Sequence, residues 1–187
     1  MTVEPQYLAG KFLVAMPGMF DPRFEHSVSV MCVHDEHGAL GIGIGHIREG
    51  IRFRELLEEL DIDPGDAPDV PVHHGGPVEP GRGFILHSND WGGTDTVEVH
   101  PLCSLSASVD ILRAIAEGRG PSRWLIALGY AGWGGGQLEE EMHHHGWYVA
   151  EGRREILFDT KAEARWMATW RAEGIDPALL APDTGHA

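Results

Sequence analysis

Glycines alternate with large apolar residues over residues 40–45, which read Leu-Gly-Ile-Gly-Ile-Gly. A period of two is typical of a β-strand, because successive side chains of a strand point to opposite faces. Leu40, Ile42 and Ile44 therefore share one face, and the other face carries no side chain. Such a bare face indicates that something approaches the backbone of the strand closely. The pattern predicts a strand-rich fold with a close approach to the backbone of residues 40–45.

Apolar patterns elsewhere predict strands interrupted by helices. The predicted strands cover residues 11–16, 27–34, 40–45, 70–74, 83–87, 96–100, 123–130, 147–150 and 155–158. The predicted helices cover residues 53–60, 106–117, 137–144 and a last segment that follows a capping box of Thr160 with Glu163 and ends near Gly174. The run 123–130 is the most apolar and is predicted to be a central strand. Since strands and helices do not alternate one for one, we predict an α+β fold, with residues 1–187 as a single domain.

The chain is strongly acidic, with 29 Asp and Glu against 14 Lys and Arg and a net charge of -15. Nucleic-acid binding usually needs a clustered basic face, and anionic membrane surfaces repel an acidic protein. The sequence also shows no helix-turn-helix with a basic recognition helix. We therefore expect no direct nucleic-acid partner and no membrane association.

Cys32 and Cys103 each lie in an apolar, strand-like run. This is typical of buried thiols in a reducing compartment rather than of a disulfide framework. The N-terminal apolar run is too short to span a membrane, is broken by Pro17 and Gly18, and is not followed by a signal-peptide cleavage site. We expect a cytoplasmic protein.

Residues 129–147, GYAGWGGGQLEEEMHHHGW, place a glycine-rich turn between a strand and a helix. This order suits a phosphate loop. However, the lysine and hydroxyl residue of a P-loop are missing, and the glycine spacing differs from that of a dinucleotide-binding turn. Three glutamates would also stand in the first helical turn and repel phosphate. The favoured interpretation is a structural turn in which a strand leads closely into a helix.

The same stretch raises a metal site as an alternative. Its acidic and histidine side chains pair at i, i+4 spacing, as Glu139 with His143, Glu140 with His144 and Glu141 with His145. No single pair supplies the three or four converging ligands of a zinc site, and the His-Glu-x-x-His signature is absent. We predict no metal ligand and no cofactor.

A hydrolytic site is the third alternative. His87, Ser88 and Asp90 stand close in sequence, but a catalytic triad is assembled by the fold and not by adjacency. The chain has no Gly-x-Ser-x-Gly elbow that would present a serine nucleophile. We identify no catalytic residue.

Several stretches, taken together and in this order, resemble the YqgE/AlgH family of bacterial proteins, which are described as uncharacterised or as transcriptional regulators. They are GKFLVAMPGMFDPRFEHSV, HDEHGALG, GGPVEPGRGFILHS, GYAGWGGGQLE and ILFD with the later Trp166. The resemblance implies an α+β fold with a bent, barrel-like sheet and about four helices packed outside. It also implies a core at about residues 7–170, with a C-terminal tail at residues 175–187. No established catalytic residues come with it.

The sequence favours a non-enzymatic protein that binds a protein partner or a small ligand, with a regulatory role suggested by the family. The alternative is an enzyme or small-molecule-binding protein whose pocket is lined by the turns at Gly75 and Gly76 and at residues 132–136. The candidate ligand or interaction residues are Gly75, Gly76, Arg82, His87, Trp133 and Gln137.

Overall fold

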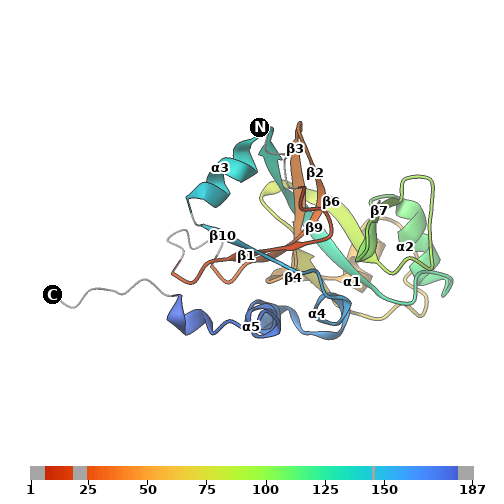
Figure 1. The fold of residues 1–187 in the computed structure, drawn as a ribbon. Helices are drawn as coiled ribbons and strands as arrows, with labels where there is room; N and C mark the ends of the chain where they lie inside the picture. The colour runs from red at the N-terminus through yellow and green to blue at the C-terminus, as the bar shows by residue number, and fades with distance from the viewer. Residues whose placement is uncertain (1–6, 19–24, 145, 181–187) are drawn as a thin grey trace.

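In the computed structural model, which describes residues 7–18, 25–144 and 146–180, ten strands pair into one curled sheet (Figure 1). The strands are β1 (Phe12–Ala15), β2 (Val28–Asp35), β3 (Gly38–Gly43), β4 (Ile47–Arg52), β5 (Pro71–His74), β6 (Val78–His87), β7 (Val97–Val99), β8 (Cys103–Ser106), β9 (Trp124–Gly134) and β10 (Trp147–Ala150). The helices are α1 (Phe53–Glu59), α2 (Val109–Ala116), α3 (Gln137–His143), α4 (Arg154–Asp159), α5 (Ala162–Ala172) and a short 3-10 helix, η1 (Pro177–Leu179). The predicted α+β fold with a bent sheet is confirmed, with five α-helices in the described residues where about four were predicted.

The long strand β9 organises the sheet. Neighbouring strands follow the order β10-β1-β2-β3-β9-β6-β8-β7, and β4 and β5 form a side branch on β9. Ile126 of β9 lies opposite Ile85 of antiparallel β6 on one side and Val72 of parallel β5 on the other, while the later part of β9 pairs with β3. The predicted central position of residues 123–130 is confirmed.

Helices cover both faces of the sheet. Leu125 and Ala127 of β9 belong to the main core, which includes side chains of α4 and α5. The alternate residues Ile126 and Leu128 belong to a second core with α1 and α2. A third, smaller cluster forms around Leu138 of α3. Because β9 is buried on both faces, it is apolar at successive positions instead of alternating.

The predicted close approach to the bare face of β3 is confirmed, and at Gly43 the approaching group is a second backbone segment. A Cβ atom on Gly43 would lie 2.7 Å from the carbonyl oxygen of His74, and one on Gly41 would lie 3.2 Å from the sulfur of Met31. The N–H of Gly43 also donates to the carbonyl of Gly75 at 2.7 Å. The segment that approaches β3 is therefore the chain that leaves β5.

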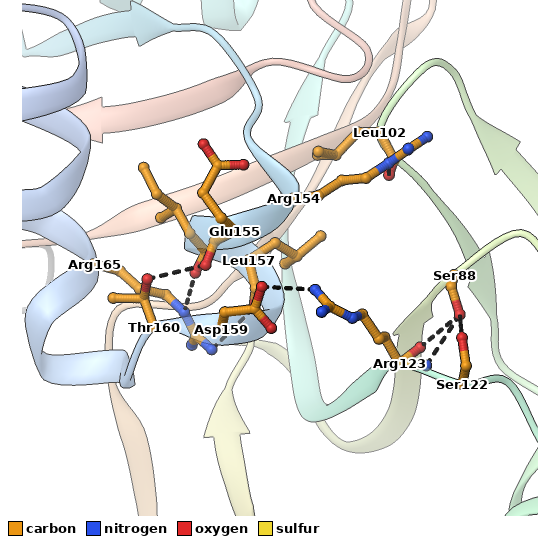
Figure 2. A network of polar contacts seen from close by, with 11 residues as sticks. Ser88, Leu102, Ser122, Arg123, Arg154, Glu155, Leu157, Asp159, Thr160 and Arg165 are labelled. Atoms are coloured by element: carbon orange, nitrogen blue, oxygen red, sulfur yellow. Dashed lines mark hydrogen bonds and ion pairs between the residues drawn. The ribbon is translucent and has the colours of Figure 1, made fainter.

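Arg165 of α5 is a buried arginine with 4% of its surface exposed. Its guanidinium donates to the carbonyl oxygens of Ile156 at 2.9 Å, Leu157 at 2.9 Å and Ile44 at 2.7 Å, and to Nε2 of His73 at 2.6 Å. Figure 2 shows it beside the end of α4. Burial lowers the pKa of Arg165 to about 10, so it stays charged at neutral pH. One side chain thus joins α5 to α4, to the segment after β3 and to β5.

His73 is the neutral acceptor in this group. Its Nδ1 lies 3.0 Å from the carbonyl oxygen of Ile126 and so carries the proton, which leaves Nε2 to accept from Arg165. Burial, followed by the charge of Arg165, lowers the pKa of His73 to about 4. The arrangement requires His73 to stay unprotonated.

The predicted strand at residues 155–158 is wrong, because these residues lie in α4. A short apolar run such as Ile156 and Leu157 fits a buried strand or a buried helix equally well. Here the carbonyls of both residues accept hydrogen bonds from Arg165, which satisfies groups that the end of a helix leaves open.

The predicted capping box of Thr160 with Glu163 is also absent. Lys161 occupies the N-cap of α5 and makes no side-chain capping bond. The hydroxyl of Thr160 donates instead to the carbonyl of Glu155 at 3.0 Å, so it closes α4 rather than opening α5. The predicted face of α5 with Trp166 and Trp170 is confirmed, since both belong to the main core.

The structure also bears on the predictions for the cysteines, the C-terminal tail and membrane-spanning segments. Cys32 and Cys103 are free, buried thiols of the main core, as expected. The predicted tail at residues 175–187 begins with Ile175 packed against that core, and residues 181–187 lie outside the described residues. Among the described helices, none has the length and apolar character that crossing a membrane demands.

We predict that Arg165→Met lowers the free energy of unfolding by about 3 to 5 kcal/mol, because it leaves buried carbonyl groups without donors. Urea denaturation measures this loss. Arg171→Met, at an exposed position of the same helix, removes the same charge and should cost less than about 1 kcal/mol. Equal losses in the two variants would contradict a structural role for the guanidinium of Arg165.

The pKa of His73 predicts how stability depends on pH. The unfolded chain binds a proton at His73 near its ordinary pKa of 6.5, whereas the folded chain does so only near about 4. The contribution is therefore complete above the unfolded pKa and falls by roughly 3 kcal/mol as the pH drops through this window. His73→Gln does not titrate, so the stability difference between wild type and variant should shrink as the pH falls. A difference that is constant across the window would refute the assignment.

Candidate functional site

Gly75 and Gly76 are packed against the backbone of β9. A Cβ on Gly75 would lie 2.1 Å from the carbonyl oxygen of Gly129, and one on Gly76 would lie 2.1 Å from the carbonyl carbon of Tyr130. Gly76 also has a φ of +155°. The two glycines border a crevice of about 40 Å³, which is room for about one water molecule. Both glycines therefore serve the close contact between the β5–β6 connection and β9.

Arg82 lies on the exposed part of β6, apart from this crevice. Its Nη1 is 3.4 Å from a carboxylate oxygen of Glu79, and its guanidinium lies 5.1 Å from the centre of the Phe84 ring. Both partners come from the same strand. A surface ion pair of this kind adds little stability.

His87 is fully buried and bonded to Ser106 of β8. Its Nδ1 donates to the carbonyl of Ser88 at 2.9 Å, so its Nε2 accepts from the hydroxyl of Ser106 at 2.8 Å. Burial lowers the pKa of His87 and keeps the ring neutral. A hydroxyl beside a neutral imidazole resembles an activated serine. However, Ser106 is 1% exposed and His87 0%, so a substrate does not reach the pair in this conformation.

Trp133 and Gln137 both donate to one carboxylate of α3, that of Glu141. The indole N–H of Trp133 donates to Glu141 at 2.7 Å, and the amide of Gln137 donates to the other oxygen of Glu141 at 3.2 Å. Gln137 also accepts from the backbone N–H of Gly134 at 2.9 Å. Strand β9 continues through Gly134, so the turn into α3 is shorter than the sequence suggests and occupies only the next two glycines. Trp133 faces the small core under α3, while Gln137 faces solvent.

Glu139 ties α3 to β2 through His34. The backbone N–H of Leu8 donates to Nδ1 of His34 at 3.1 Å, so Nε2 carries the proton and donates to Glu139 at 2.5 Å. Hydrogen bonding from its own backbone and from His34 lowers the pKa of Glu139, against the opposing effect of its partial burial. The carboxylate of Glu139 thus helps to hold α3 against the sheet.

No group of three or more His, Cys, Asp or Glu side chains in the described residues is arranged to hold a metal ion. Of the three predicted pairs, Glu139 bonds to His34, and Nδ1 of His144 donates to the carbonyl of Glu140 at 2.9 Å. His145 lies outside the described residues.

A hollow of about 430 Å³ lies between α3 and the start of β10. We call it the α3–β10 hollow. It is lined by Gln137, Glu140, Glu141, His144, Gly146 and Trp147. Carboxylates and an indole ring therefore border the same space, and one predicted residue, Gln137, is among them.

A second hollow of about 380 Å³ lies beside α4 and holds residues that the sequence did not indicate, including Arg123 and Arg154. Arg154 bonds to the carbonyls of Pro101 and Leu102, which lie more than 50 positions away in sequence. No local motif connects such residues, so only the fold could bring them together.

A protein-family model described as AlgH-like matches residues 12–178. The chain belongs to the AlgH-like family. Among its relatives, a UPF0301 protein of Novosphingobium aromaticivorans is 68% identical over 98% of this chain and 99% of that protein. A UPF0301 protein of Sphingopyxis alaskensis is 53% identical over the full length of both.

Solved structures agree with this assignment. The solution structure of the AlgH protein from Pseudomonas aeruginosa matches with a TM-score of 0.80, 38% identity and full coverage of both chains. A crystal structure of a Corynebacterium diphtheriae protein matches with a TM-score of 0.72 at 19% identity, covering 97% of this chain and 94% of that one, and supports the fold alone. The fold of this chain is therefore shared with both solved structures over nearly all of their length.

We predict that Gly76→Ala destabilises the protein by at least about 2 kcal/mol, because its Cβ would overlap the backbone of β9 and its φ is unfavourable for alanine. Thermal or urea unfolding measures the loss. Gly81→Ala is the matched control on β6, since a Cβ there has no atom within 4 Å. It should stay within about 0.5 kcal/mol of wild type. If both variants were equally stable, the close contact at Gly76 would not contribute to the stability of the fold.

Proposed function

We propose that this AlgH-like chain is a cytoplasmic, non-enzymatic protein that regulates a protein partner by binding a positively charged segment of it in the α3–β10 hollow. The observation that carries the proposal is the joint placement of carboxylates and an indole ring around one hollow of about 430 Å³. Lysine and arginine side chains favour such surroundings, through ion pairing and through contact with an aromatic face.

The acidic side chains at the rim of this hollow can bind a cation without first rearranging. Glu140 is exposed and makes no ion pair with any described residue. Glu141 is held in place by the donors of Trp133 and Gln137, so its position is set before a partner arrives. Trp147 forms another wall. The net charge of -15 would additionally raise the rate at which a basic segment is encountered.

A regulatory role through a protein partner also fits the charge of the chain better than contact with DNA. Fifteen excess negative charges oppose the phosphate backbone, whereas the same charges attract a basic peptide. The free, buried thiols of Cys32 and Cys103 suit a reducing compartment.

An oligo-arginine peptide tests the proposal. Calorimetry should show binding that weakens as salt rises, and amide NMR shifts should concentrate at residues 137–144 and 147. Glu140→Lys should weaken binding by about tenfold. Glu59→Lys makes the same charge change at an exposed position of α1 and should leave the affinity nearly unchanged.

Equal weakening by the two variants would mean that the peptide senses only net charge, and would reject the α3–β10 hollow as the docking site. Tighter binding to a short DNA duplex than to the peptide would reject the protein-partner proposal itself.

A further inference from the structure

The hollow beside α4 is built from three segments that lie far apart in sequence. Residues 88–90 follow β6, residues 122–123 precede β9, and Arg154 and Phe158 belong to α4. Figure 2 shows Arg154 and Arg123 between α4 and Ser88. The volume of about 380 Å³ falls within the usual range for small-molecule sites, roughly 300 to 1,000 Å³.

Arg154 is a fixed cation without a matching anion. Its Nε donates to the carbonyl of Leu102 at 3.0 Å, and its Nη2 donates to the carbonyl of Pro101 at 2.8 Å. No carboxylate of the described residues lies within ion-pair distance of it, although acids outnumber bases two to one in the whole chain. Figure 2 shows Glu155 pointing away from it. A guanidinium has five donors, so donors of Arg154 remain for a ligand.

Of the two carboxylates near this hollow, one has a cationic partner and the other has only neutral donors. Asp159 lies 2.6 Å from Nη1 of Arg123. Asp90 accepts from the hydroxyl of Ser88 at 2.6 Å and from the backbone N–H of Ser122 at 3.1 Å. Hydrogen bonds from Ser122 and Ser88 lower the pKa of Asp90 to about 2. Asp90 therefore stays ionised but has its oxygens occupied by donors, and Arg154 is the cation of the hollow that has no ion-pair partner.

Asn89 offers a further donor in this hollow. Asn89 uses its amide oxygen to accept from the hydroxyl of Ser104 at 2.6 Å, which leaves its NH₂ group for a ligand. Phe158 supplies an apolar wall and packs against the main core. The guanidinium of Arg154 and the amide donor of Asn89, in the same hollow as an aromatic ring, suit an oxyanion that carries an apolar part.

We propose that the hollow formed by residues 88–90, residues 122–123 and α4 binds a small organic oxyanion, a carboxylate or a phosphate ester. Its charged group pairs with Arg154 and Asn89, and its apolar part lies against Phe158. This site is separate from the α3–β10 hollow, and its ligand has the opposite charge to the partner segment proposed there.

Titration of the full chain with phenyl phosphate, benzoate, inorganic phosphate and neutral benzamide, followed by amide NMR, tests this site. We expect saturable shifts at residues 88–90, 122–123 and 154–158 with at least one aromatic oxyanion at millimolar concentrations. A preference for phenyl phosphate identifies phosphate esters as the ligand class, and a preference for benzoate identifies carboxylates.

Arg154→Gln should weaken binding by about ten- to a hundredfold, the effect of losing a charge-assisted hydrogen bond. Arg171→Gln removes the same charge from an exposed position of α5 and should leave binding unchanged. If Arg154→Gln fails to fold, Asn89→Asp still tests the site, because it places a repelling carboxylate at an exposed position and should abolish binding.

The proposal is overturned if the aromatic oxyanions do not shift the amide signals of these residues. It is equally overturned if Arg154→Gln and Asn89→Asp bind the oxyanions as tightly as wild type does. It is also overturned if benzamide binds as well as benzoate, since the charge would then play no part. Inorganic phosphate binding as tightly as phenyl phosphate would remove the role given to Phe158.

Discussion

The hydrogen bonds of the buried Arg165 guanidinium are the interactions on which the packing of α4 and α5 against the sheet depends. It is a charge inside an apolar core, and such a charge is stable only when each donor has an acceptor. The acceptors come from three other elements: two carbonyls of α4, the carbonyl of Ile44 after β3, and the neutral ring of His73 on β5. The position of α4 and α5 on the sheet is therefore fixed by hydrogen-bond geometry as well as by apolar packing.

A second constraint lies where β3, β5 and β9 approach one another. Glycines at positions 43, 75, 76 and 129 remove side chains from places where backbone atoms meet closely. These contacts let β9 pair with β5 and β6 in its first half and with β3 in its second half. Gly75 and Gly76, which the sequence suggested as lining a pocket, thus serve the crossing of strands.

The two hollows follow from this frame. One forms where α3, fixed by Glu139 and Glu141, stands beside the start of β10. The other forms where α4, fixed by Arg165, stands beside the loops at the ends of β6 and β9. The first carries carboxylates and the second a guanidinium without an ion-pair partner, which is why we propose ligands of opposite charge for them.

The sequence alone determined the α+β class, the central strand at residues 123–130, the close approach at residues 40–45 and the apolar face of the last helix, because these rest on periodicity and on glycine placement. It misplaced residues 155–158, since a short apolar run has no period that separates strand from helix, and the carbonyls of α4 are satisfied by Arg165 from the next helix. Of the six candidate site residues, the structure joins only neighbours, Gly75 with Gly76 and Trp133 with Gln137. Arg154, its carbonyl partners and Asn89 stand in separate segments with no shared motif. Tertiary structure alone decided that they meet, because hydrogen bonds between distant segments leave no periodic trace in the chain.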